Sequence, residues 1–184
     1  MADHDLTGVL LVGGASRRFL TPKALAPTPK ALARFRGETL AERAYRILEE
    51  AFGDVIVVGK ATDGLPLPFP VLDDGSEIRA PIVGVAAALR LAGTELCVVV
   101  PTDMPWLTPA ALQDLAAAAD GVDAAVPQTG PLPGAYRRSA LPVLERRIAV
   151  GDLALHRALG QLETRVVQQD EQLLRNVNTR EDLG

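Results

Sequence analysis

Cysteine and histidine are scarce in this sequence, and their scarcity excludes several kinds of site. The single cysteine, Cys97, cannot form an internal disulfide. It lies within the apolar run LCVVV, so we expect a buried core thiol there. The two histidines, His4 and His156, have no partner at the spacing of a metal site or a catalytic triad. Zinc binding and histidine catalysis are therefore not expected.

Long apolar runs and an excess of basic charge are also lacking. No apolar run approaches the roughly 20 residues that a membrane-spanning helix needs. The first residues, MADHDLTG, are acidic and do not have the pattern of a signal peptide. A net charge of -4, from 19 basic and 23 acidic residues, argues against a protein that coats nucleic acid. We therefore expect a cytoplasmic protein without a membrane or nucleic-acid partner.

The overall composition is that of an ordinary globular protein. The chain has 184 residues, of which 48% are hydrophobic and 23% are charged. These values suit a folded chain with a sizeable core. We expect a single domain that covers residues 1–184.

Apolar segments typical of strands alternate along the chain with segments of helical spacing. We expect strands over residues 7–12, 54–58, 96–100, 124–126 and 164–167. We expect helices over residues 38–52, in an Ala- and Leu-rich segment ending near Ala92, from Pro109 onward, over 139–148 and 152–159, and in a turn from Thr179. This alternation predicts an α/β fold, with a mostly parallel sheet and helices on both faces. In such sheets ligands bind at the carboxyl ends of the strands.

The first strand leads into a glycine turn with basic side chains. The stretch Val9–Arg18 reads VLLVGGASRR. Gly13 and Gly14 let the backbone turn sharply and approach a ligand closely. Ser16 and the two arginines that follow it supply a hydroxyl and two cations suited to phosphate. The stretch is neither a P-loop nor a G-x-G-x-x-G motif. A phosphate-binding corner and a tight turn with solvated arginines are both open at this point.

Two lysines follow this corner within a duplicated segment. The sequence TPKALA begins at Thr21 and again at Thr28, so that Lys23 and Lys30 occupy equivalent positions. The unit is too short for a repeat architecture, so we interpret it as a tandem duplication in a loop. Either lysine has the charge to complete a phosphate site.

Two later segments carry acidic residues that could reach a ligand. Asp103, in VVVPTDMPWL, stands just beyond a buried strand. Mg²⁺ takes one or two carboxylates together with phosphate oxygens, so Asp103 is a candidate metal ligand. An aspartate that only forms a turn before proline is the alternative. Asp73 and Asp74 are adjacent, so an extended backbone points them in opposite directions and only one reaches a given ligand. We expect Trp106 to pack under its loop.

The end of the chain carries two asparagines and a capping signal. Asn176 and Asn178 flank a valine, so on an extended segment both face the same side. Thr179 with Asp182 three residues later resembles a capping box, with aspartate in place of the usual glutamate or glutamine. Capping explains the threonine but leaves the two asparagines as candidate site residues.

Together these segments resemble the molybdenum cofactor guanylyltransferase family, within the wider group of α/β nucleotidyltransferases. The family pattern L-A-G-G-x-S-x-R-M-G-x-D-K-A-L corresponds to LLVGGASRRFLTPKAL, C-D-M-P-F-L to PTDMPWL, and N-x-N-T-P-E-D-L to NVNTREDL. The segments RAPIVGVAAAL and PLPGAYRRSALPVL also occur in the family's order. Several motifs in the right order make the resemblance more specific than any one of them.

The resemblance implies a three-layer, Rossmann-like nucleotidyltransferase fold and a particular reaction. GMP would be transferred from GTP to the molybdopterin-bound molybdenum cofactor. The products would be the guanine dinucleotide form of that cofactor and pyrophosphate. The enzyme would use Mg²⁺, and transient protein partners would hand the molybdenum cofactor over.

The resemblance also implies roles for individual residues. The nucleotide and its triphosphate would be held by the first motif, through Leu11, Val12, Gly13, Gly14, Ser16 and Arg18. Asp103 would bind Mg²⁺, and one of the duplicated lysines would act with Arg18 on the phosphates. The guanine and ribose would lie near Asp73 and the segment Pro81–Gly84. Asn176 and Asn178 would face the cofactor or metal side.

The chain departs from the family pattern at three places. Leu20 stands where the family has a glycine, a proline precedes each lysine in place of an aspartate, and Ala80 replaces a glycine. Lys23 has the family spacing from the glycines, whereas Lys30 has it from the Gly37 turn, and we favour Lys30 because that turn is rigidly placed. With Ala80 the choice of base is open. The alternatives are therefore transfer from CTP or to another phosphate acceptor, and a non-catalytic nucleotide-binding module.

Overall fold

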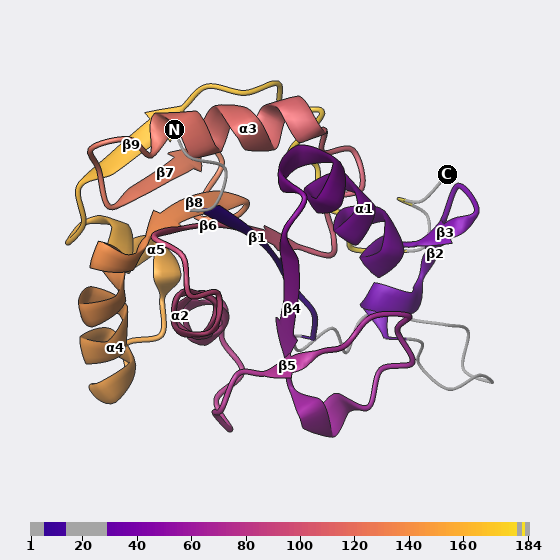
Figure 1. The fold of residues 1–184 in the computed structure, drawn as a ribbon, viewed down its shortest axis with the longest axis horizontal. Coiled ribbons are helices and arrows are strands. Elements are labelled where there is room, and N and C mark those ends of the chain that lie inside the picture. The colour runs from indigo at the N-terminus through magenta and orange to yellow at the C-terminus, as the bar shows by residue number, and fades with distance from the viewer. Residues whose placement is uncertain (1–5, 14–28, 180–181, 183–184) are drawn as a thin grey trace.

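A seven-stranded sheet lies at the centre of the part of the chain that the structure describes. The structure is a computed structural model, and it describes residues 6–13, 29–179 and 182. The strand order is β5-β4-β1-β6-β8-β7-β9 (Figure 1). The strands are β1 (Leu6–Leu11), β4 (Val55–Gly59), β5 (Leu72–Asp73), β6 (Leu96–Pro101), β7 (Ala124–Pro127), β8 (Gly134–Arg137) and β9 (Thr164–Val167).

The strand β1 lies between two parallel neighbours and is covered on both faces. It pairs with β4 on one side and with β6 on the other. Val9 and Leu10 point to opposite faces, and both are fully buried. Burial on both faces explains the uninterrupted apolar run in this stretch. The register places Leu11 beside Val58 and Pro101, so the three strands end at the same edge of the sheet.

One strand of the sheet runs against its neighbours. β8 pairs antiparallel with both β6 and β7, while β7 pairs parallel with β9. The sequence did not predict β8, because GAYR is too short to show an alternating pattern. Tyr136 of β8 is fully buried, and its hydroxyl donates to the carbonyl of Pro131 at 2.6 Å. The sheet is therefore mostly parallel, as predicted, with one reversed strand.

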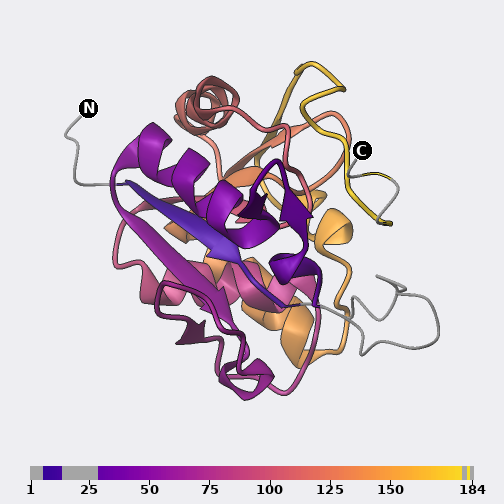
Figure 2. The same cartoon turned by 90° about the vertical axis from the view of Figure 1, so that its right-hand side faces the viewer.

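Helices cover both faces of the sheet. They are α1 (Leu40–Phe52), α2 (Pro81–Leu91), α3 (Pro109–Ala118), α4 (Leu141–Ala149) and α5 (Leu155–Leu159). α1 and α3 pack into one buried cluster together with Leu10, whereas α2, α4 and α5 pack into a second cluster together with Val9. Figures 1 and 2 show these helices on the two sides of the sheet. The predicted three-layer nucleotidyltransferase architecture is confirmed.

Two helices begin at threonine caps. The Thr39 hydroxyl accepts from the backbone N–H of Glu42 at 3.1 Å, and the Glu42 carboxylate accepts from the Thr39 N–H at 2.8 Å. The helix expected from residue 38 begins later, because β3 (Glu38–Thr39) pairs with β2 (Arg34–Phe35) in a small hairpin. Thr108 caps α3, as predicted, through a 3.3 Å bond from a backbone N–H.

The two helices predicted beyond residue 138 are shorter than expected. The first begins as a 3-10 turn, η3 (Arg138–Ala140), before α4. The second begins at Leu155, after a turn in which Oδ1 of Asp152 accepts from the Ala154 N–H at 3.4 Å and the Asp152 carboxylate pairs with Arg147. Residues 152–154, expected to be helical, therefore lie outside α5.

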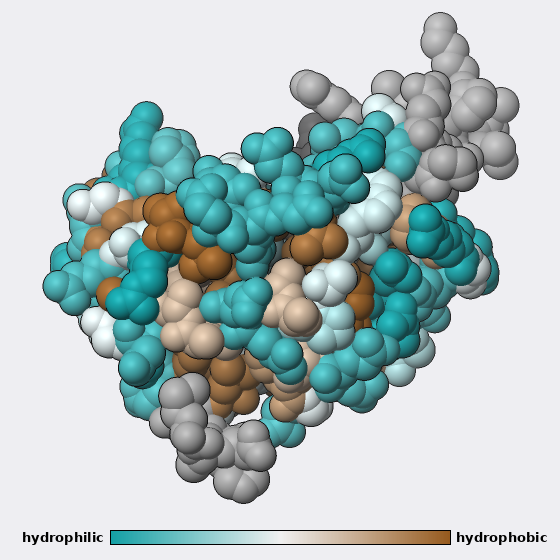
Figure 3. Space-filling view, turned by 90° about the horizontal axis from the view of Figure 1, so that it is seen from above, coloured by the Kyte–Doolittle hydropathy of each residue, from teal (hydrophilic) through white to brown (hydrophobic). Residues whose placement is uncertain are grey.

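The surface over α3 mixes hydrophobic and hydrophilic residues. Seen from above in Figure 3, brown and tan areas are interrupted by teal side chains. Within the described ranges, none of the helices combines the length and the hydrophobicity that crossing a membrane requires. The cytoplasmic location stays a prediction.

The buried thiol of Cys97 gives a test of this fold. Burial raises the pKa of Cys97 to about 12, and its side chain on β6 is fully covered. Because the thiolate is the reactive form, the native protein should react with an aromatic disulfide reagent at least about 100-fold more slowly than the denatured protein at pH near 8. Absorbance of the released thiol measures both rates. Equal rates would contradict the placement of β6 in the middle of the sheet.

Candidate active site

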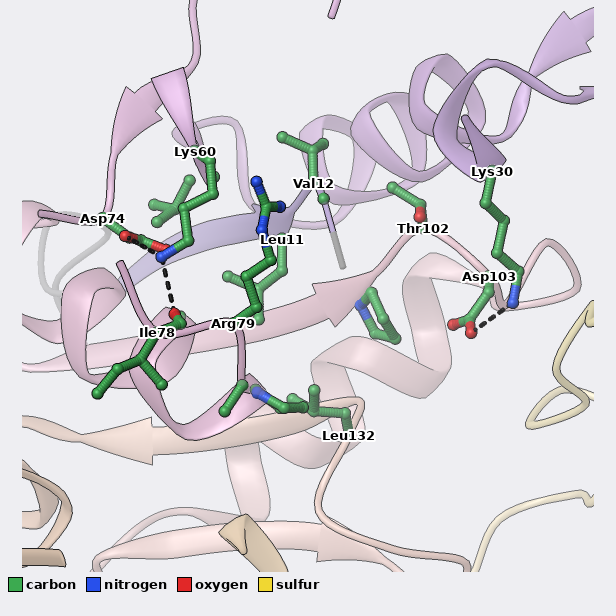
Figure 4. Close-up of a pocket in the computed structure, with 17 residues that line it drawn as sticks. Leu11, Val12, Lys30, Lys60, Asp74, Ile78, Arg79, Thr102, Asp103 and Leu132 are labelled. Carbon is green, nitrogen blue, oxygen red and sulfur yellow. Dashed lines mark hydrogen bonds and ion pairs between the residues drawn. The ribbon is translucent and has the colours of Figure 1, made fainter. Parts of the chain in front are cut away.

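The carboxyl ends of β1, β4 and β6 open into a pocket of about 380 Å³ (Figure 4). The loop before α2 and the first turn of that helix form another wall. Parallel sheets usually bind their ligands at the carboxyl ends of the strands, which is where this pocket lies. Its lining residues are Leu11, Val12, Gly13, Lys30, Val58, Gly59, Lys60, Asp74, Ile78, Arg79, Ala80, Pro81, Gly84, Pro101, Thr102, Asp103 and Leu132.

At one end of the pocket, three residues from distant motifs meet. The Lys30 ammonium lies 2.9 Å from Oδ2 of Asp103 and donates to Oδ1 of Asn178 at 3.3 Å. Lys30 belongs to a short 3-10 turn, η1 (Lys30–Leu32), and Asp103 lies two residues beyond the end of β6. The side chains of Lys30 and Asp103 are 11% and 23% exposed, so the pair is only partly accessible to water. A cation, a carboxylate and an amide are thereby brought together at one place.

The C-terminal segment is fastened beside this cluster. The Val177 N–H donates to the backbone carbonyl of Asp103 at 2.8 Å, and the Val177 side chain is fully buried against the β2–β3 hairpin. The predicted capping box is confirmed, because Oδ2 of Asp182 accepts from the Thr179 N–H at 2.7 Å and the Thr179 hydroxyl accepts from the Asp182 N–H at 3.4 Å. Asn176 and Asn178 are both exposed, on the side opposite the buried Val177, and neither lines the pocket, although Asn178 contacts Lys30, which does.

At the other end of the pocket lies a lysine that sequence reasoning missed. Lys60 follows β4, and its ammonium donates to Oδ1 of Asp74 and to the carbonyl of Ile78, both at 2.8 Å, and to the carbonyl of Ser76. A lysine has three N–H donors, so these bonds use all of them. Its side chain is 10% exposed. Lys60 therefore holds the loop before α2, and the only signal in the sequence was its position two residues beyond the strand expected over residues 54–58.

The structure turns Asp74, and not Asp73, toward the pocket. Asp73 does not line it. Its carboxylate accepts from the backbone N–H groups of Ala61 and Gly75, each at 2.7 Å, and these bonds hold the pKa of Asp73 below its usual value. The pairing of β5 with β4 at Gly59 decides which carboxylate points inward. Of the two adjacent aspartates, only Asp74 therefore lines the pocket, and a contact of Asp73 with the nucleotide stays a prediction.

Two glycines allow close approach at the pocket wall. Gly13 has a φ of +90°, a conformation that residues with a Cβ rarely adopt. A Cβ on Gly84 would lie only 3.0 Å from Cδ1 of Leu11, so this glycine lets α2 come close to the end of β1. Both positions, with Leu11, Val12 and Pro81, were predicted as binding residues, and all of them line the pocket.

The remaining predicted residues fall outside what the structure describes. Gly14, Ser16, Arg18 and Lys23 lie in the undescribed part of the chain, and their contacts stay predictions. Within the described ranges, no group of three or more acidic, histidine or cysteine side chains is placed to hold a metal ion. Within the described part of the chain, Asp103 therefore has no group of further acidic, histidine or cysteine ligands that could complete a metal site with it.

The sequence and the fold both connect this pocket to known transferases. A sequence model of the MobA-like NTP transferase domain matches residues 8–167. The chain belongs to the MobA-like NTP transferase family. A relative from Desulfosudis oleivorans, named molybdenum cofactor guanylyltransferase, is 28% identical over 192 residues, which cover 97% of this chain and 92% of the relative. A Rhodopirellula baltica relative, named probable molybdenum cofactor guanylyltransferase, is 32% identical over 202 residues. The match covers 100% of this chain and 92% of the relative.

Solved structures share the architecture of this NTP transferase. Molybdopterin-guanine dinucleotide biosynthesis protein A from Archaeoglobus fulgidus is 25% identical, with a TM-score of 0.76 over 96% of this chain and 94% of that one. 2-C-methyl-D-erythritol 4-phosphate cytidylyltransferase from Thermus thermophilus is 20% identical, with a TM-score of 0.70 over 96% and 94%. The second likeness shows the fold alone. The recognised family and nucleotidyltransferase class are confirmed, and the substrates must be argued from the site.

We predict that Lys60→Met destabilises the protein by about 3 kcal/mol, because it leaves the largely buried Asp74 carboxylate without its cation. Urea unfolding followed by circular dichroism measures the change. The double variant Lys60→Met, Asp74→Leu should recover part of the loss, since no buried charge remains.

Arg90→Met is the matched control. Arg90 pairs with Glu145 at the surface, where both side chains are more than 40% exposed, so its loss should cost less than about 1 kcal/mol. Equal costs for Lys60→Met and Arg90→Met would contradict the anchoring role of Lys60.

Proposed function

We propose that this protein transfers GMP from GTP to the molybdopterin-bound molybdenum cofactor, forming its guanine dinucleotide form and releasing pyrophosphate. Membership in the NTP transferase family and the names of its relatives support this proposal. The observation that carries it is the meeting of Lys30, Asp103 and Asn178, from three separate motifs, at one end of a pocket at the strand ends.

Nucleotidyl transfer requires positive charge at the end of the pocket where Lys30 and Asp103 lie. A phosphate oxygen of the acceptor attacks the α-phosphorus of GTP, and the bond from that phosphorus to the oxygen bridging the β-phosphate breaks. Pyrophosphate leaves with the electron pair of that bond, so negative charge grows on its oxygens. A fixed cation stabilises such charge. Lys30 is suited to this because its ammonium is only partly exposed and lies beside Asp103.

We propose that Asp103 holds Mg²⁺ together with the nucleotide phosphates. A carboxylate at the edge of a pocket suits this ion, which takes one or two carboxylates and completes its shell with phosphate oxygens and water. The bond from Val177 to the Asp103 carbonyl keeps this loop in place. When bound, Mg²⁺ supplies positive charge between the carboxylate and the phosphates.

The other end of the pocket suits a guanine base. Asp74 has one oxygen held by Lys60 at 2.8 Å and by the Ser76 N–H at 3.0 Å, so its carboxylate is fixed in position. An ionised carboxylate only accepts hydrogen bonds. The pairing edge of guanine donates from its ring N–H and its amine, whereas the corresponding ring nitrogen of cytosine accepts. We therefore assign GTP in preference to CTP, despite Ala80 in place of the family glycine.

We place the acceptor beside Asn178, outside the nucleotide pocket. The amide oxygen of Asn178 is engaged with Lys30, and the capping box at Asp182 fixes the segment that carries it. Direct handover of the molybdenum cofactor by a partner protein completes the proposal, because an unstable acceptor is best passed without release into water.

The function is tested by measuring pyrophosphate release with purified protein, Mg²⁺, the molybdopterin-bound cofactor and each of GTP, CTP and ATP. We expect release from GTP at least about tenfold faster than from the other two, corresponding to one well-placed polar contact. Faster release from CTP would overturn the guanine assignment. Binding of GTP without release, in the presence of intact acceptor, would identify a non-catalytic nucleotide-binding module.

The duplicated lysines make a second test. Lys30→Ala should lower turnover about a hundredfold, because it removes a cation that stabilises charge in the transition state. Lys23→Ala should leave turnover within about threefold of the wild type if the second copy carries the function. Steady-state rates at saturating GTP measure both. The reverse pattern would transfer the role to Lys23.

A further inference from the structure

An ion pair on the rim of the pocket has no task in the proposed transfer reaction. Arg79, in the loop before α2, meets Asp63, the last residue of the 3-10 turn η2 (Ala61–Asp63). Nη1 of Arg79 lies 3.0 Å from Oδ2 of Asp63, and Nη2 lies 2.6 Å from Oδ1. The guanidinium therefore binds the carboxylate in a bidentate manner, through two parallel hydrogen bonds. The two side chains are 41% and 21% exposed, so the pair lies at the surface of the pocket.

This pair lies over the glycine turn that follows β1. Arg79 lines the pocket, and in Figure 4 its side chain crosses the pocket toward Val12. A Cβ on Gly13 would lie 2.8 Å from Oδ2 of Asp63, so the carboxylate rests directly against this glycine. The family resemblance implies that Gly13 is among the residues that hold the triphosphate. The guanidinium is thus held within reach of the nucleotide by an acidic side chain.

The two cations of this rim differ in how firmly they are bound. Lys60 is largely buried and has all three donors engaged, so it is not available to a ligand. Arg79 is bound to a single carboxylate and is the more exposed of the two. A bidentate arginine–carboxylate pair is stronger than most exposed ion pairs, so the phosphates of a nucleotide have to outcompete Asp63 for the guanidinium. The planar fork that binds a carboxylate with two bonds binds a phosphate in the same way.

We propose that Arg79 exchanges Asp63 for the phosphates of the bound nucleotide, and that Asp63 is the competing carboxylate that holds Arg79 in place when no nucleotide is bound. This rests on the proposed function only in that a nucleoside triphosphate occupies the pocket. The arginine beside it holds the pKa of Asp63 below its usual value, so Asp63 is charged and competes at neutral pH.

The exchange predicts opposite effects for the two members of one ion pair. Arg79→Gln should weaken GTP binding about tenfold, because it removes a charged donor from the phosphates. Asp63→Asn should tighten GTP binding about threefold, because no pair has to be broken. Arg79→Lys should fall between the wild type and Arg79→Gln, since it keeps the charge and loses the fork. Isothermal titration with GTP and Mg²⁺ measures each affinity.

Two further measurements test whether the exchange itself causes these changes in affinity. When Arg79 is already replaced by Gln, adding Asp63→Asn should no longer tighten GTP binding, because Asp63 then has no arginine to hold away from the phosphates. A gain that persists undiminished would show that Asp63 acts on the nucleotide by its own charge, and would overturn the exchange. Inorganic tripolyphosphate, used as a competitor of GTP, should lose affinity for Arg79→Gln as GTP does. If its affinity is unchanged, Arg79 contacts the nucleoside and the phosphate assignment is wrong.

Arg90→Gln is the matched control, since it removes one arginine from an exposed ion pair on α2 outside the pocket lining. It should leave the affinity for GTP unchanged. If Arg79→Gln and Asp63→Asn both weaken binding, the pair only ties two loops together and the exchange is overturned. A wild-type chain that binds none of GTP, CTP and ATP overturns the proposed function as well. If the wild type binds CTP instead, only the guanine assignment fails, and the same variants are compared with CTP.

Discussion

The parallel pairing of β1 with β4 and β6 is the constraint on which the rest of the structure depends. Hydrogen-bond register decides where each strand stops, and here all three stop at one edge. The residues that follow them, Gly13, Lys60 and Asp103, therefore line one pocket although they lie far apart in the chain. Because β1 is buried on both faces, a slip of one residue would exchange its two sets of core contacts, so the register is strongly specified.

Around this pocket, acidic and basic side chains are paired before any ligand arrives. Asp103 has Lys30, Asp74 has Lys60, and the rim has its own arginine pair. The pairs differ in burial and in the number of protein acceptors on the cation. Lys60 is fully engaged and maintains the shape of a loop, whereas Lys30 touches one carboxylate and one amide. Two chemically identical side chains thus differ, according to their surroundings, in how many protein acceptors they engage.

The sequence predicted those features whose cause is local or periodic. Buried strands, the cap at Thr108 and the box at Thr179 each depend on residues within a few positions of one another. The inward turn of Asp74 depends instead on the pairing of two strands. The role of Lys60 depends on carbonyl groups 16 and 18 residues away, which no local pattern records. Each of the duplicated lysines has the family spacing from one neighbouring motif, so spacing alone could not decide between Lys23 and Lys30.

The bond between Val177 and Asp103 has a consequence for how the protein comes into being. It joins the end of β6 to a segment more than 70 residues later, almost at the end of the chain. During synthesis β1, β4 and β6, whose ends form most of the pocket wall, are made well before Val177. The hydrogen bond that holds the loop of Asp103 can therefore form only after most of the chain has been made. A chain that stops before Val177 lacks this bond.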